Sequence, residues 1–95
     1  MKKVFAIALT TVLFSGVTQA CTKPTAPALP DASTAVTAQM VKAKNEVKSY
    51  IASAESYLEC VADAKKHNKM VDDMKTVAST FNTIVREYKQ RMANA

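Results

Sequence analysis

Few residues of this sequence are of a type that could do chemistry, and the two cysteines, Cys21 and Cys60, come first among them. Two thiols form a disulfide most simply if the chain is exported to an oxidising compartment. Alternatively, Cys21 is the acylated first residue of a lipoprotein, preceded by Thr18, Gln19 and Ala20. Gln19 is bulky and polar where a lipoprotein signal normally has a small residue, and acylation would leave Cys60 an unpaired thiol. The sequence therefore favours a disulfide between Cys21 and Cys60.

The other candidates for chemistry fit structural roles better than catalytic ones. His67 is the only histidine, so the sequence has no two-histidine metal spacing and no Cys-x-x-Cys-His haem motif. Asp72 and Asp73 lie near the expected start of a helix, where negative charge is favourable. Thioethers can bind copper, but helical spacing indicates core packing for the methionines after the N-terminal signal, which are Met40, Met70, Met74 and Met92. We expect no catalytic, cofactor or metal site and no small-molecule substrate, and therefore no enzyme.

The N-terminus has the parts of a secretory signal peptide of the bacterial type. Lys2 and Lys3 supply positive charge, an almost wholly apolar run follows over residues 4–16, and small residues stand at the positions that precede a cut before Cys21. The apolar run is 13 residues long, whereas a membrane-spanning helix needs roughly 20. We expect residues 1–20 to be cleaved and the mature protein to be secreted to the periplasm.

The mature chain is small and only mildly basic. Removal of residues 1–20 leaves 75 residues and lowers the net charge from +5 to +3, because two lysines are lost. The remaining basic residues are interspersed with acidic ones, as on an ordinary solvated helix face, so we expect no nucleic-acid binding. A chain of this length makes at most one domain, whose small core benefits from a covalent staple.

The elements that position the cysteines are one extended segment and two helices. Residues 21–33 contain three prolines at a spacing of three, typical of an extended polyproline conformation. Apolar residues at helical spacing then predict helices over about 34–64 and 69–92, within a hairpin spanning 34–95. The stripes are Met40, Val47, Ile51, Ala54, Leu58 and Val61, then Met70, Met74, Val77, Phe81, Ile84 and Tyr88. We predict an all-α fold, an antiparallel two-helix hairpin with the proline-rich segment tied to the first helix by the disulfide.

A change of phase, rather than a glycine or proline, separates the two stripes. Val61 and Met70 are nine residues apart, so one straight helix would carry its two apolar stripes on opposite faces. A turn near residues 65–68, with Asn68 as the N-cap of the second helix, brings the stripes together. The alternative is one extended helix, which makes sense only in an oligomer.

The disulfide implies that the proline-rich segment runs back along the first helix. On that helix, Tyr50 and Tyr57 lie on the same flank as Cys60, and we hypothesise that Pro27 packs near Tyr50 and Pro24 near Tyr57. The alternative is that both tyrosines belong to the core between the helices.

A two-helix hairpin leaves part of its apolar surface uncovered. On the second helix this surface includes Val71, Ala78, Val85 and Met92, which repeat every seven residues. We expect a non-catalytic binding or structural role through this surface, with a second copy of the chain (a homodimer) or an envelope protein as partner. The alternative function is that of an outer-membrane lipoprotein anchored through acylated Cys21.

The order and spacing of several short motifs resemble a family of small exported proteins of unknown function in Gram-negative bacteria. The motifs are Cys21-x-x-Pro24, Leu29-Pro30-Asp31, Gln39-Met40, Val47-Lys48-x-Tyr50, Tyr57-Leu58-x-Cys60, Asn68, Val71-x-x-Met74, Val77-Ala78, Phe81-Asn82 and Val85-Arg86-x-Tyr88-Lys89. The chain departs from the family at Ala32, where glycine is frequent, and in a shorter segment between the helices. The resemblance supports export and the cysteine pairing and implies no activity.

Overall fold

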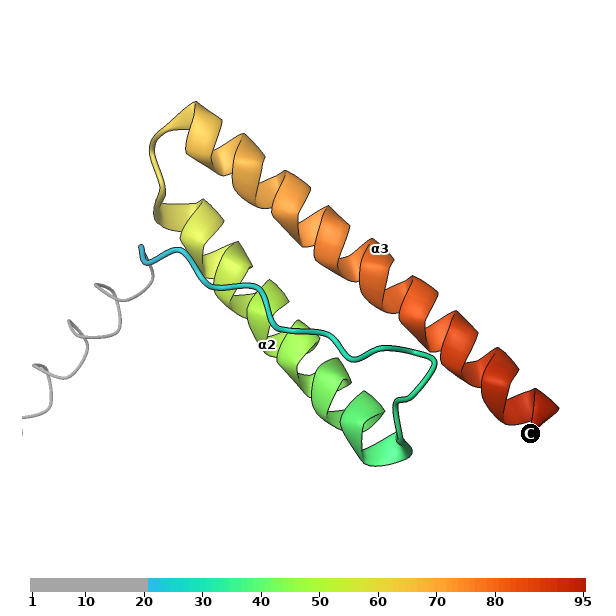
Figure 1. Cartoon of the computed structure of the whole chain (residues 1–95). Helices are drawn as coiled ribbons and strands as arrows, with labels where there is room; N and C mark the ends of the chain where they lie inside the picture. Colours follow the sequence, from blue (N-terminus) through green and yellow to red (C-terminus); the bar gives the residue numbers. More distant parts are fainter. Residues whose placement is uncertain (1–20) are drawn as a thin grey trace, which may run out of the picture.

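Two antiparallel helices form a hairpin, and an extended segment runs along one of them (Figure 1). The computed structural model describes residues 21–95, in which helix α2 spans Thr37–Cys60 and helix α3 spans Ala64–Asn94. The all-α hairpin predicted from the two stripes is confirmed. The signal peptide expected over residues 1–20 lies outside the described residues.

Helix α2 begins three residues later than predicted because a separate turn precedes it. The Asp31 carboxylate accepts hydrogen bonds from the backbone N–H and the hydroxyl of Ser33, at 2.8 and 2.7 Å. The Asp31 carbonyl accepts from the N–H of Ala35 at 2.9 Å, which closes the turn. At the true start of α2, the side chain of Gln39 accepts a hydrogen bond from the N–H of Val36 at 2.9 Å. Gln39 thereby satisfies an N–H group that the helix itself leaves unpaired.

The turn between the helices lies at Val61–Asp63, earlier than the predicted position at residues 65–68. Val61 and Asp63 are both extended, and no residue between 21 and 95 has a positive φ angle. The Asp63 carboxylate accepts hydrogen bonds from the N–H groups of Lys65 and Lys66, at 2.8 and 3.2 Å. Asp63 is therefore the N-cap of α3, because its side chain satisfies two N–H groups of the first turn. Asn68, predicted as the cap, lies inside the helix.

The core lies along the seam between α2 and α3. The buried residues of α2 alternate at spacings of three and four and are Met40, Ala43, Val47, Tyr50, Ala54 and Tyr57. This spacing keeps one helix face toward a partner over the whole helix. From α3, Met70 is fully buried against Tyr50, Ala54 and Tyr57. Both predicted stripes thus meet in one core.

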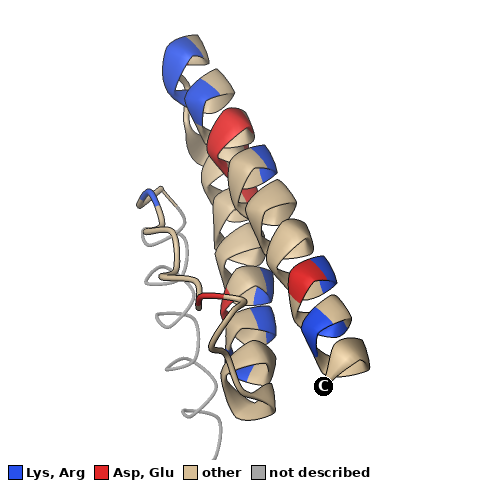
Figure 2. Cartoon of the chain, turned by 45° about the vertical axis from the view of Figure 1, so that its right-hand side comes forward, with Lys and Arg blue, Asp and Glu red and all other residues tan. Residues whose placement is uncertain are grey.

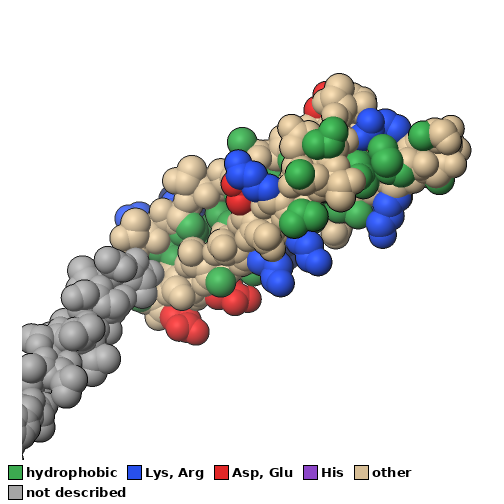
Figure 3. Space-filling view, turned by 90° about the horizontal axis from the view of Figure 1, so that it is seen from below, with side chains coloured by type: hydrophobic (Ala, Val, Ile, Leu, Met, Phe, Trp, Pro, Cys, Tyr) green, Lys and Arg blue, Asp and Glu red, His purple; other side chains and the backbone are tan. Residues whose placement is uncertain are grey.

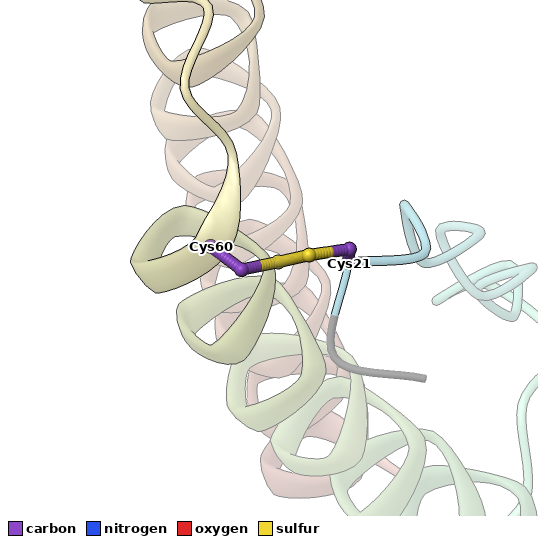
Figure 4. Close-up of a disulfide and its surroundings, with 2 residues drawn as sticks. All are labelled: Cys21 and Cys60. Atoms are coloured by element: carbon purple, nitrogen blue, oxygen red, sulfur yellow. A yellow bond between two sulfur atoms is a disulfide. The ribbon is translucent and has the colours of Figure 1, made fainter. Parts of the chain in front are cut away.

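The disulfide between Cys21 and Cys60 is present, with 5.5 Å between the two Cα atoms. It joins the start of the extended segment to the last turn of α2 (Figure 4). From there the segment runs antiparallel along α2 to the turn at Asp31 (Figure 1). The predicted tie between the N-terminal segment and the first helix is confirmed.

Candidate interaction surface

The extended segment gives the hairpin two different sides. On one side, the segment lies against α2 and reaches α3, because Lys23, Pro24 and Thr25 line a groove together with Thr76 and Val77 of α3. We call the opposite side the open face. Its apolar residues are defined below.

On the segment side, Tyr50 and Tyr57 are buried, with 5% and 7% of their surfaces exposed. Both pack in the cluster that holds Met70, so they belong to the core between the helices. Burial raises the pKa of Tyr50 above its ordinary value of 10.0, and the nearby carboxylate of Asp73 adds to the effect. These two tyrosines therefore act in packing and are not part of an accessible surface.

Pro27 lies near Tyr50, as we hypothesised, but Pro24 lies further along α2 than the level of Tyr57. Pro24 and Pro27 line the same groove as Tyr50, whereas the segment residue that lines a groove with Tyr57 is Lys23. An extended chain advances about 3.1 Å per residue and a helix about 1.5 Å. Within three residues of the disulfide, Pro24 has therefore passed the level of Tyr57, which is three helical residues from Cys60.

Asp73 links the segment to α3. Its carboxylate accepts a hydrogen bond from Nζ of Lys69 at 2.6 Å and lies 3.6 Å from Nζ of Lys23. The hydrogen bond from Lys69 lowers the pKa of Asp73, and the same contact raises the pKa of Lys69. Because α3 begins at Ala64, Asp73 lies beyond its first turn. The predicted role at a helix start is replaced by this ion pair across two elements.

At the other end of the hairpin, polar contacts join α3 to the start of α2. The hydroxyls of Thr37 and Tyr88 share a hydrogen bond of 2.6 Å between the oxygens. The Arg91 guanidinium donates to the carbonyl of Ala35 and lies 5.5 Å from the centre of the Tyr88 ring. These contacts fix the register of the two helices and were not foreseen from the sequence.

The open face carries a band of half-buried apolar residues from both helices. Helix α2 contributes Ile51 and Leu58, and α3 contributes Val71, Ala78 and Val85. Within each helix these residues are seven apart, which is about two turns, so they lie in a line. Met92 continues the line of α3 and is 44% exposed. The structure therefore brings together the four α3 residues predicted for an interaction surface and adds two from α2.

Charged residues border this band along the edge of α2. Lys44 and Lys48 lie in its N-terminal part, where Figure 2 shows basic positions, and Glu55 and Glu59 lie in its C-terminal part. All four side chains are exposed, and none forms an ion pair with another residue in the range 21–95. Hydrophobic side chains also reach the surface elsewhere, as the view from below shows (Figure 3), and Val36 and Val41 are more than half exposed.

The described residues hold no cluster of three or more side chains able to bind a metal ion. Within residues 21–95, neither helix combines the length and the hydropathy that a membrane span requires. Comparisons with protein-family models, with curated proteins and with solved structures each gave no match.

Proposed function

We propose that this chain is an exported periplasmic protein with a non-catalytic binding role, which it performs through the open face. The observation that carries the proposal is the band of apolar residues on this face, which consists of Ile51, Leu58, Val71, Ala78 and Val85. The extended segment covers the other side of the same hairpin, whereas no segment of residues 21–95 covers this one. Uncovered apolar bands on small proteins are typical of interaction sites.

The disulfide supports an exported location and disfavours the lipoprotein alternative. Disulfides persist in oxidising compartments such as the periplasm. The sulfur of Cys21 is bonded to that of Cys60, and the same sulfur would have to carry the lipid of a lipoprotein. The resemblance to small exported proteins of Gram-negative bacteria agrees with this location.

The binding role is tested by photo-crosslinking in living cells that export the full chain. A photoreactive residue replaces Ala78 on the open face, and in a control it replaces Arg86, which is exposed on the outer side of α3. We expect a crosslinked product of discrete mass from position 78 and none from position 86. No product from position 78 would overturn the proposed role.

Location and anchoring are tested by the intact mass of the exported protein, purified without reductant and treated with a thiol-alkylating reagent. We expect a chain that starts at Cys21, carries no lipid and takes up no alkylating reagent. A mass increased by acyl chains would establish the lipoprotein alternative instead.

A further inference from the structure

The charged edge of α2 holds two pairs of like charges where opposite charges would stabilise the helix. Lys44 and Lys48 are four residues apart, and so are Glu55 and Glu59. Like charges at this spacing are neighbours on a helix surface and destabilise it slightly. Elsewhere the chain places opposite charges at this spacing, as in Lys42 with Glu46, 3.6 Å apart. Lys65 and Lys69 of α3 are also four residues apart, but Lys69 pairs with Asp73 at 2.6 Å. The two like pairs at the border of the open face have no such partner within residues 21–95.

The two pairs match each other in an antiparallel arrangement. Lys44 and Glu55 are eleven residues apart, as are Lys48 and Glu59, and eleven residues make about three helical turns. All four therefore lie on one edge of α2, with the basic and acidic pairs equally far from a point beside Ile51. A twofold axis through that point, perpendicular to the helix, places the basic pair of one copy opposite the acidic pair of the other.

The same axis is compatible with the apolar residues of α3. The contacts of Thr37 with Tyr88 and of Tyr57 with Met70 set the register of the two helices. In that register, a point beside Ile51 on α2 is level with α3 at about residues 74–75. The axis then places Val71 of one copy near Ala78 of the other. A larger side chain thus meets a smaller one, as close packing of helices requires.

We propose that the open face binds a second copy of this chain in an antiparallel, twofold-symmetric dimer. In it, Lys44 and Lys48 of each copy face Glu59 and Glu55 of the other, and the apolar bands meet to form a four-helix arrangement. This inference rests on the proposed function and names the partner. A second copy is favoured over an envelope protein because the charges of the face complement those of the same face turned around.

The dimer is tested with two charge variants of the purified, oxidised protein in sedimentation experiments. The acidic variant, Lys44→Glu/Lys48→Glu, leaves only negative charges on this edge, and the basic variant, Glu55→Lys/Glu59→Lys, leaves only positive ones. We expect the wild type to dimerise and each variant alone to bind itself at least about tenfold more weakly, because four attractive contacts become repulsive. An equimolar mixture of the two variants is expected to form a heterodimer.

A matched control distinguishes the effect of charges on this edge from the effect of net charge on dimerisation. Lys65→Glu/Arg86→Glu changes the net charge as the acidic variant does, at exposed positions away from the open face. We expect it to dimerise like the wild type, and circular dichroism checks that all variants are folded. A monomeric wild type at high concentration would overturn the inference, as would a mixture that forms no heterodimer. The proposed function would still stand if the crosslink from position 78 gave a product of a mass other than that of two copies.

Discussion

At the scale of single residues, the methionines show how position decides the role of a side chain. Met70 is fully buried against two tyrosines of α2, whereas Met92 lies 44% exposed near the end of α3. Helical spacing was sufficient to assign Met70 to the core. Met92 lies beside the stripe and beyond the start of α2, so no neighbouring helix covers it.

This contrast gives a prediction for stability. Met70→Ala leaves a cavity in the core, and we expect it to lower the free energy of unfolding by about 2–5 kcal/mol. Met92→Ala is the matched control and should change it by less than about 0.5 kcal/mol. Urea denaturation followed by circular dichroism measures both values. Equal effects of the two substitutions would contradict the burial of Met70.

Tyr50 gives a prediction for alkaline pH. Its pKa is raised above 10.0 by burial and then by Asp73, so the folded state holds the phenolic proton more tightly than the unfolded state does. Stability contributed by the neutral phenol is complete below about pH 10 and is lost as the pH rises through the higher folded value. We expect the urea concentration at the midpoint of unfolding to decrease as the pH is raised from about 9 to about 11.

The phenolate absorbance identifies the residue responsible. In a pH titration of the folded protein, the difference between the wild type and Tyr50→Phe should contain a component that titrates above pH 10.0. A component that titrates at or below that value would show that Tyr50 is solvated.

At the scale of elements, the positions of the two helix starts could not be predicted from periodicity alone. The phase change between Val61 and Met70 requires a break but allows it anywhere between them. Asp63 and Asn68 are equally good caps by residue type, and the structure selects Asp63. The earlier break starts α3 at Ala64, after a turn of three residues that follows Cys60, so that Met70 reaches Tyr57.

The choice of cap is open to direct measurement. Asp63→Ala removes the acceptor of two hydrogen bonds and should lower the free energy of unfolding by about 1 kcal/mol. Asp63→Asn should keep most of this free energy, because the asparagine side chain can accept the same hydrogen bonds. Asn68 is exposed inside the helix, so Asn68→Ala should leave the free energy of unfolding unchanged or raise it by roughly a few tenths of a kcal/mol. A larger loss from Asn68→Ala than from Asp63→Ala would make Asn68 the N-cap of α3.

At the scale of the whole molecule, the sequence allowed the architecture to be predicted better than its details. Two cysteines and two stripes were enough for the stapled hairpin, because a disulfide and an amphipathic face each have one simple use in a short chain. The contacts that close the far end were not predictable, because Thr37, Tyr88 and Arg91 are distant in the sequence and have no distinguishing spacing. The register of the open face depends on those contacts.

The disulfide should supply a large part of the stability of this molecule. It closes a loop between positions separated by 39 residues, which corresponds to about 4 kcal/mol in the chain-entropy model. We expect Cys21→Ser/Cys60→Ser to lose about that much free energy of unfolding, and the reduced wild type to match the variant. Urea denaturation with and without reductant provides the comparison. A stable reduced protein would show that the helices need no staple.

The position of this disulfide also determines how the covalent chain is divided. Cys60 is the last residue of α2, and the turn follows immediately, so the bridge closes a ring that contains the segment and α2 and leaves α3 outside as a linear tail. A single protease cut at Val61–Asp63 would yield a cyclic fragment and a separate peptide, joined by core packing and by the ion pair of Lys23 with Asp73. A cut between Cys21 and Thr37 would release no fragment until the bridge was reduced. The order in which pieces appear on limited proteolysis therefore reports where the ring ends.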